Sequence, residues 1–325
     1  MDTIDRQLLN LLQVNFPLVT EPFSELGRRL EIGEDAAIRR VRSLKDRGII
    51  RQISAVFDSH ALGYSSSLAA FSVPRERVEQ VAEIVNAHPG VSHNYERDHT
   101  YNLWFTITVP PGTTPEAEAD RLAAQANPRA FRMFPTIRLF KIGVAFDMVG
   151  DGTDMLITQP SAVRHDPVEL DESDIAAVRV LQRDLPIDQR PFASLAVRAG
   201  MREDELIRRA RMFLQLGAMR RYAAVLKHRE AGYLSNAMVV WNVPKNMIEY
   251  IGPEFALHRA VSHCYERHTY PDWPYSVFTM VHGRSIEDCE KAARELSNAT
   301  GITDYVLLYS VREFKKTRVL YYEHT

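Results

Sequence analysis

Apolar residues recur at helical spacing in three segments near the start of the chain, and a β-rich run follows the third segment. The recurring positions are Ile4, Leu8 and Leu12, then Phe23, Leu26 and Leu30, then Ile38, Val41 and Leu44. Gly48 ends the third segment, where a glycine commonly caps a helix. Three helices followed by residues 49–57 predict a helix-turn-helix unit in which the β-rich run forms the wing.

The pattern changes after the wing. We expect strands at 68–73, 101–109 and 137–146 and helices at 76–86 and 115–126. With one more strand between the helix at 76–86 and the strand at 101–109, the whole segment reads strand, helix, strand, strand, helix, strand. This order is typical of a ferredoxin-like βαββαβ sandwich, an antiparallel sheet with helices on one face, and it places the protein in the α+β class.

The sequence repeats itself after a shift of about 170 residues. Matching segments are Pro22-Phe23 and Pro191-Phe192, Ile38-Arg39-Arg40 and Ile207-Arg208-Arg209, and Ser92–Arg97 and Ser262–Arg267. A polar stretch with turn-forming residues and no helical period separates the two copies. We therefore expect tandem units, with winged helices at 1–60 and 170–228, ferredoxin-like domains at 61–147 and 229–325, and a linker at 148–169.

Composition and charge exclude several classes of protein. The 325 residues are 45% hydrophobic and 25% charged, as in ordinary globular proteins. An acidic N-terminal segment and the lack of an apolar run of bilayer length predict no secretory signal and no membrane span. With only Cys264 and Cys289, no disulfide framework is possible, and we expect a cytoplasmic protein. A net charge of −2 does not favour DNA.

Candidate chemistry is concentrated in the repeated Ser-His-x-Tyr-Glu-Arg segments. Six of the 11 histidines lie in these segments or beside them: His88, His93, His99, His258, His263 and His268. Histidine titrates near neutral pH and can donate a proton, and the guanidinium groups of Arg97 and Arg267 are suited to bidentate binding of carboxylates. A purely structural role remains the alternative, because duplication copies scaffold residues too.

Two resemblances cover the chain. Each half resembles the Lrp/AsnC transcription regulators, from Asp5–Ile50 into the ferredoxin-like domain. The blocks His88–Phe105 and Val261–Tyr275 are similar to the two subunits of the siroheme decarboxylases, of the AhbA or NirD and the AhbB or NirL type, here fused as in NirDL proteins. This second resemblance implies removal of two acetate carboxylates from siroheme to give didecarboxysiroheme, on the way to heme d1 or to heme.

The resemblance also implies partners and site residues. The halves would pair with each other, a homodimer is allowed, and no cofactor is needed beyond the iron tetrapyrrole substrate, with bound heme or siroheme as a further option. The protein alone would supply no metal site, and the axial histidine to the substrate iron stays open. Catalytic candidates are His263, His268, Arg267, His93, Arg97 and His99. Substrate-binding candidates are His228, His60, Tyr265, Tyr95, Trp273, Trp104, and Arg312, Lys316 and Arg318, which we expect on one face of the last strand.

Two other functions compete with the lyase. The first is a DNA-binding regulator, but Glu34-Asp35 and Glu203-Asp204 begin the predicted recognition helices, where they would repel phosphate, so we expect no DNA binding. The second is a tetrapyrrole carrier without turnover. Cys264 could ligate iron, although a small buried side chain is the simpler interpretation, because the first half has Asn94 there.

Overall fold

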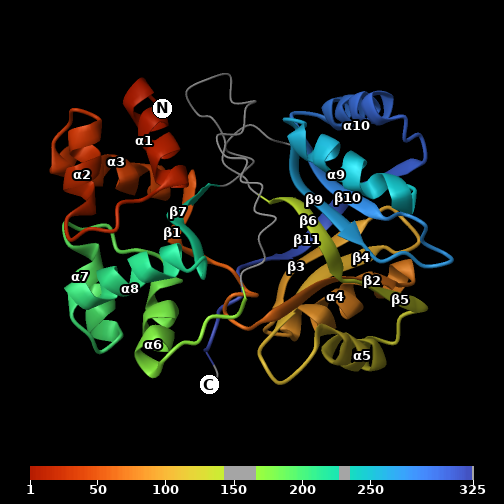
Figure 1. The fold of residues 1–325 in the computed structure, drawn as a ribbon, viewed down its shortest axis with the longest axis horizontal. Helices are drawn as coiled ribbons and strands as arrows, with labels where there is room; N and C mark the ends of the chain where they lie inside the picture. Colours follow the sequence, from red (N-terminus) through yellow and green to blue (C-terminus); the bar gives the residue numbers. More distant parts are fainter. Residues whose placement is uncertain (143–165, 227–234, 324–325) are drawn as a thin grey trace.

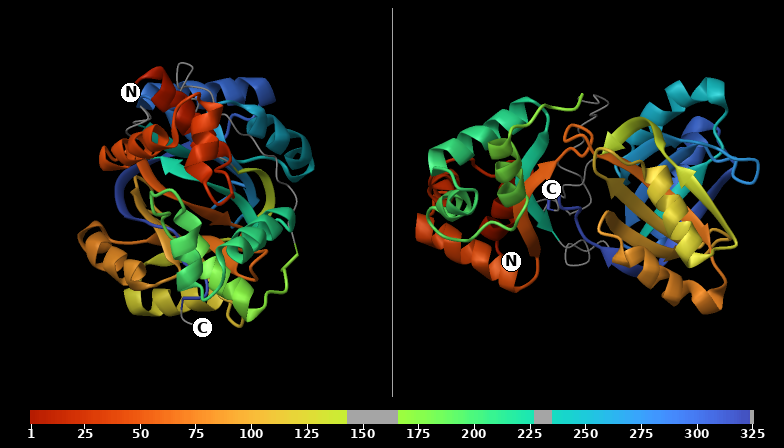
Figure 2. Two further views of the ribbon diagram at one scale, coloured as in Figure 1. Left: turned by 90° about the vertical axis from the view of Figure 1, so that its left-hand side faces the viewer. Right: turned by 90° about the horizontal axis from the view of Figure 1, so that it is seen from below.

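A computed structural model describes residues 1–142, 166–226 and 235–323, and it consists of two parts that lie side by side. One part contains the helix-turn-helix segments of both halves, and the other contains a large sheet with its covering helices (Figures 1 and 2). Most of the predicted linker and His228 lie outside the described residues. Both parts therefore mix the two halves of the sequence.

The helical part has six helices in the described residues, three from each half. They are α1 (Thr3–Val14), α2 (Pro22–Arg29), α3 (Glu34–Asp46), α6 (Glu172–Leu181), α7 (Pro191–Arg198) and α8 (Glu203–Gln215). The carboxylates of Asp2 and Asp171 cap the first helix of each half, and a proline begins the second. The apolar faces of all six helices meet in one continuous core, so the two units are packed as one body.

The β-rich run after each helix-turn-helix pairs with its copy from the other half. Strand β1 (Ile50–Phe57) lies antiparallel to β7 (Met219–Leu226), and the two form a separate two-stranded sheet. The predicted strand at 49–57 is thus confirmed, but the expected wing within one unit is wrong. Apolar side chains on these strands, such as Ile53 and Tyr222, are fully buried only because both halves contribute to the shared core.

The second part is a nine-stranded sheet in the order β5-β2-β4-β3-β11-β8-β10-β9-β6. The strands are β2 (Ser65–Ser72), β3 (Val91–Arg97), β4 (Leu103–Val109), β5 (Ala130–Phe134), β6 (Thr136–Ile142), β8 (Ser235–Trp241), β9 (Val261–Arg267), β10 (Val277–Gly283) and β11 (Tyr305–Lys316). Helices and short 3-10 turns cover its outer faces: α4 (Val78–Ala87), α5 (Pro115–Ala126), α9 (Ile248–Leu257), α10 (Ile286–Thr300), η1 (Arg75–Arg77) and η3 (Lys245–Met247). The tandem α+β architecture is as predicted, although β5 was not expected.

The last strand of each half pairs with a strand of the other half. Strand β11 pairs with β8 of its own half through Tyr305–Tyr309 and with β3 of the other half through Ser310–Lys316. Strand β6 of the first half pairs in turn with β9 of the second. Because β5 and β6 are separated by Pro135 alone, the two ends of the sheet are held together covalently. The sheet is therefore continuous around an interior to which both halves contribute.

Three apolar cores stabilise this part. Two lie under the covering helices, one in each half. The third lies inside the sheet and includes Trp104, Phe134, Trp273 and Phe278, whose rings contact one another. It leaves the interior partly unfilled on the side that faces the helical part. Among the described residues, no helix combines the length and apolar character needed to cross a membrane.

Candidate active site

A cavity of about 480 Å³ lies where the interior of the large sheet meets the helical part. Its size falls within the range typical of small-molecule sites. Strands β3, β4, β9 and β10 form its walls, β1 contributes Ala55, Val56 and Phe57, and the end of β11 with the chain that follows it contributes residues 316–319. Both halves and both parts of the fold therefore build this cavity.

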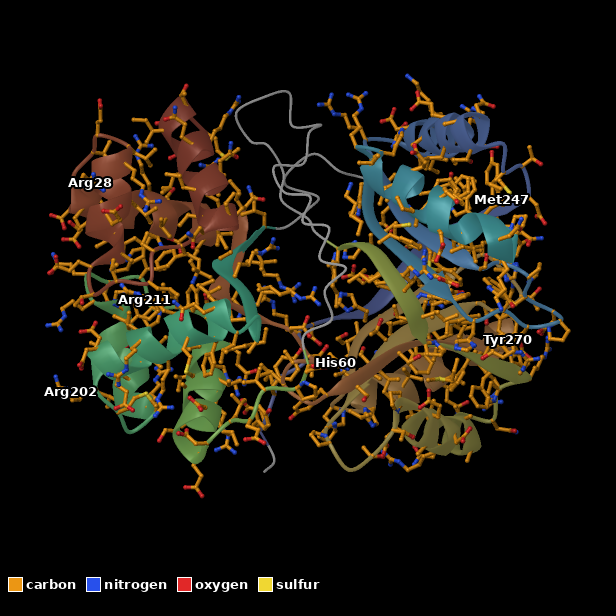
Figure 3. All side chains as sticks on the ribbon, in the orientation of Figure 1. Arg28, His60, Arg202, Arg211, Met247 and Tyr270 are labelled. Atoms are coloured by element: carbon orange, nitrogen blue, oxygen red, sulfur yellow. The ribbon has the colours of Figure 1, made fainter. Side chains whose placement is uncertain are left out.

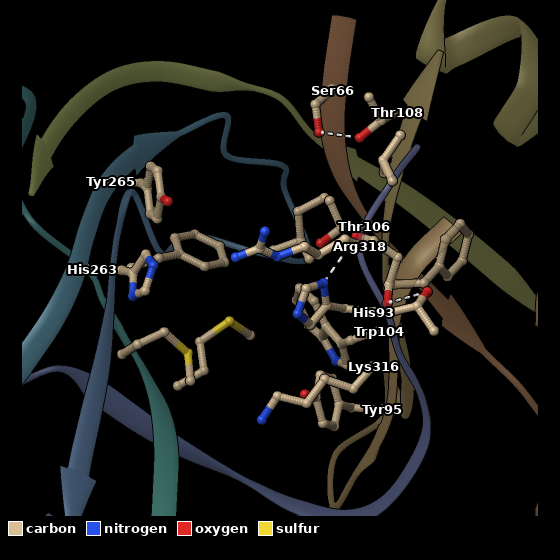
Figure 4. Close-up of a pocket in the computed structure, with 18 of the residues that line it drawn as sticks. Ser66, His93, Tyr95, Trp104, Thr106, Thr108, His263, Tyr265, Lys316 and Arg318 are labelled. Atoms are coloured by element: carbon tan, nitrogen blue, oxygen red, sulfur yellow. Dashed lines mark hydrogen bonds between the residues drawn. The ribbon is translucent and has the colours of Figure 1, made fainter. Parts of the chain in front are cut away.

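The repeated Ser-His-x-Tyr-Glu-Arg segments are strands β3 and β9, and each turns three side chains into the cavity. Alternate residues of a strand share a face, so His93, Tyr95 and Arg97 line the cavity from β3. Strand β9 supplies the equivalent set, His263, Tyr265 and Arg267. In each set the histidine ring is stacked with the tyrosine ring, with centroids 6.2 Å and 6.1 Å apart. Figure 4 shows His263 and Tyr265 on the side of the cavity opposite His93 and Tyr95.

The two arginines are charged groups held without a carboxylate. The Arg97 Nη1 donates to the carbonyl of Leu308 at 2.5 Å, and the Arg267 Nη1 donates to the carbonyl of Phe134 at 2.5 Å and to the Thr136 hydroxyl at 3.3 Å. The Nε atom of each arginine is buried and has no hydrogen-bond partner in the described part of the chain. Burial lowers the pKa of each guanidinium to about 10, so both stay charged at neutral pH.

Two further cations reach the cavity from the end of the chain. Lys316 ends β11, and Arg318 donates to the Ser54 hydroxyl at 2.6 Å. Burial, with help from the nearby guanidiniums of Arg221 and Arg51, lowers the pKa of Arg318 to about 10. Among the described residues that line the cavity, none is Asp or Glu. Four basic side chains thus surround a space without a carboxylate among its described lining residues, although Lys316 also pairs with Glu313, which does not line the cavity, at 3.9 Å.

The prediction that Arg312 lies on the same face of the last strand as Lys316 and Arg318 is wrong. Register shifts in the pairing of β11 with β3 between Ser310 and Arg312, and again between Glu313 and Lys315, interrupt the alternation of side chains. Arg312 therefore points away from the cavity and pairs with Glu96 at 2.6 Å and Glu79 at 2.7 Å. Only Lys316 and Arg318 of the three predicted cations line the site.

His93 is held as a neutral imidazole. Burial, together with the positive charges of Lys316 and Arg51, lowers its pKa to about 4. Its Nδ1 atom is 2.9 Å from the Ser92 hydroxyl. Burial also raises the pKa of Tyr95 and Tyr265, so both phenols keep their protons. The first-half set therefore offers neutral hydrogen-bonding groups beside buried cations.

The remaining predicted residues lie elsewhere. His268 is exposed and lines neither this cavity nor the neighbouring one that contains His60. His99 packs edge-on against Trp273, which belongs to the inner core, whereas Trp104 reaches the cavity wall. His60 lies between the two parts of the fold (Figure 3), in a neighbouring cavity of about 940 Å³ that shares Tyr265 and Arg267 with the first.

Several residues at the cavity were not singled out from the sequence. Phe278, Met238 and Met280 give apolar walls, Gln182 comes from the helical part, and His282 contacts the Ser262 hydroxyl at 2.7 Å. Their spacing carries no signal, because they meet only through strand pairing between distant segments. Cys264 is fully buried, and burial raises its thiol pKa, so the prediction of a small buried side chain is confirmed. The described residues contain no cluster of three or more metal-ligating side chains.

Comparison with known proteins fits this geometry. A family model for the "Siroheme decarboxylase NirDL-like HTH domain" matches residues 5–51 and 174–220, and one for the "AsnC-like ligand binding domain" matches 61–141 and 230–315. The siroheme decarboxylase of Hydrogenobacter thermophilus is 40% identical over 317 residues, which is 97% of this chain and 94% of the relative. The chain belongs to the siroheme decarboxylase family.

Solved structures and separate subunits agree with this assignment. A crystal structure of the siroheme decarboxylase NirDL in complex with an iron-uroporphyrin III analogue superposes with a TM-score of 0.77 at 35% identity, covering 98% of this chain and 94% of that one. The siroheme decarboxylase β subunit of Methanosarcina barkeri is 47% identical over 150 residues, 46% of this chain and 99% of the relative. The α subunit of Desulfovibrio desulfuricans is 44% identical over 151 residues, 46% of this chain and 87% of the relative. Family members thus occur as separate subunits and as fused chains, as the resemblance implied.

Proposed function

We propose that this protein removes two acetate carboxylates from siroheme and yields didecarboxysiroheme, a step toward heme d1 or heme. The observation that carries the proposal is the cavity with Arg97, Arg267, Lys316 and Arg318 on its walls and no acidic side chain among its described lining residues. Siroheme is an iron tetrapyrrole with eight carboxylates, so it would bring the negative charge that this cavity lacks.

Substrate binding follows from the cost of buried charge. A buried guanidinium is unfavourable unless hydrogen bonds or an opposite charge compensate for lost hydration. Arg97 and Arg267 keep a free Nε in the described structure, so a substrate carboxylate would complete their hydrogen bonding. Trp104, Phe278 and Met280 supply the apolar surface that a flat macrocycle needs. The site is suited to a molecule that is apolar at its centre and anionic at its rim.

The reaction needs one proton for each carboxylate removed. The bond between the acetate methylene and the carboxylate carbon breaks, carbon dioxide leaves, and the electron pair stays on the methylene carbon. A proton then joins that carbon and gives a methyl group. We assign proton donation to His263, whose imidazole lines the cavity, whereas His93, which is neutral because burial lowers its pKa to about 4, would hydrogen-bond the substrate. Arg267 and Arg97 would hold carboxylates that are not removed.

One experiment tests this function against both alternatives. Purified protein is incubated with siroheme without oxygen, and the mass of the product is measured. Loss of two carbon dioxide molecules is the expected result. Bound siroheme of unchanged mass would indicate a carrier, and retardation of DNA at physiological salt with no turnover would indicate a regulator.

A further inference from the structure

Ser262 connects two histidines in the second half of the site. Its hydroxyl oxygen lies 2.8 Å from Nδ1 of His263 and 2.7 Å from Nε2 of His282. A serine hydroxyl has one proton to donate and two lone pairs, so it can accept a hydrogen bond from one imidazole while it donates to the other. The three side chains form a continuous hydrogen-bonded chain, with both imidazoles on the cavity wall and Ser262 buried behind them. The Ser262 hydroxyl also lies 3.3 Å from the Met280 carbonyl, a longer contact than either of its contacts with the imidazoles.

The first half lacks this chain at the equivalent place. On β4, Thr106 lies opposite His93, and on β10, Met280 lies opposite His263. Two residues further along each strand, the same face carries Thr108 in the first half and His282 in the second. Thr108 donates to the Ser66 hydroxyl at 3.0 Å, and Ser92 contacts His93 at 2.9 Å with no second imidazole bonded to it among the residues that the structure describes.

We propose that His282 is a proton-relay residue, which resupplies His263 through Ser262. The proposal rests on the decarboxylase function. His282, as imidazolium, passes its Nε2 proton to the Ser262 oxygen, and the Ser262 hydroxyl proton moves to Nδ1 of His263. His263 then gives its Nε2 proton to the methylene carbon left by departing carbon dioxide. His282 ends neutral, and because it is partly exposed, solvent returns its proton.

The assignment explains why a second histidine is placed behind the first. Each decarboxylation consumes one proton. A bound tetrapyrrole is large enough to cover the cavity and to keep water from His263. A protonated His282 on the same wall would hold that proton in reserve, so that it reaches His263 without opening the site. Ser262 is buried, so the link itself is shielded from solvent.

The test compares His282→Gln and His282→Thr with the wild-type chain in single-turnover conversion of siroheme without oxygen. Glutamine keeps a hydrogen-bond donor near Ser262 but does not titrate, and threonine copies the first half. We expect both variants to react at least ~10-fold more slowly, with the dissociation constant for siroheme changed less than about twofold. Added imidazole should raise the rate of His282→Thr. The control is His258→Gln, a second-half histidine paired with Glu295 outside the cavity, which should react at the wild-type rate.

Each outcome decides the relay. A wild-type rate for His282→Gln shows that hydrogen bonding alone suffices and overturns the relay. The relay is also overturned if the loss of rate in the variants is matched by a loss of siroheme affinity, or if added imidazole does not raise the rate of His282→Thr. These results leave the decarboxylase function intact, because the wild-type chain still converts siroheme. A wild-type chain that releases no carbon dioxide overturns the function and the relay together.

Discussion

The two halves of the cavity share one strand sequence but differ in the groups around it. In the first half, burial and then the charges of Lys316 and Arg51 lower the pKa of His93 to about 4 and keep its imidazole neutral. In the second half, His263 is linked through Ser262 to another imidazole. The duplicated residues therefore occupy equivalent places in the cavity, but their neighbours differ. Only the second half, among the described residues, has a second imidazole linked to its cavity histidine.

The largest expected difference is between the two cavity histidines. We expect His263→Ala to slow decarboxylation by about 100-fold or more, since general acid catalysis typically contributes about 10²–10⁴-fold. His93→Ala should have a smaller effect, because its imidazole is neutral at neutral pH. Single-turnover product masses measure both, with the melting temperature as a check on folding. A greater loss in His93→Ala would reverse the comparison.

The arginines should matter more equally, because each half holds its own in the same way. We expect Arg267→Lys and Arg97→Lys each to weaken siroheme binding by about 10–100-fold, since a hydrogen bond to a charged group contributes about 1.5–3 kcal/mol and lysine lacks the bidentate fork. Absorbance titration without oxygen measures the change. Arg132→Lys is the control, because Arg132 pairs with Asp272 outside the cavity.

A pH series should show the charge environment of the first half. His93 binds a proton at about pH 4 in the folded chain, compared with 6.5 for an ordinary histidine, so the unfolded chain binds more protons between these values. Stability must therefore fall as pH decreases through this window. The melting temperature of the wild-type chain should decrease between pH 7 and pH 5, and we expect a smaller decrease in His93→Gln. An identical decrease in both proteins would contradict the assigned environment.

The smallest effect is expected at the outer face of the last strand. Arg312→Ala should change siroheme affinity by less than about twofold and stability by about 1 kcal/mol or less, because its pairs with Glu79 and Glu96 are partly exposed. Lys316→Ala is the matched variant on the cavity side and should weaken binding several-fold. Similar losses in the two variants would mean that the strand presents both cations to the substrate.

The sequence predicted the repeat, the α+β class and the six side chains that β3 and β9 present to the cavity, because each of these depends on a local period or on copied motifs. It did not reveal the pairing of β1 with β7 or the exchange of β6 and β11, since hydrophobic alternation does not identify a strand's partner. Arg312 was misplaced for a related reason, because register shifts depend on the neighbouring strand. His282 was missed because the contact with Ser262 spans two strands.

The path of β11 has a consequence for synthesis on the ribosome. Strand β3 of the first half pairs with β4 on one edge, but in the described residues its other edge is covered by Ser310–Lys316 of the second half. A nascent first half would therefore carry an open strand edge for most of translation, and such edges invite pairing with other chains. The need for chaperones should be greatest before β11 leaves the ribosome. Removal of β11 should reduce solubility more than removal of an equally long segment from residue 1 onward.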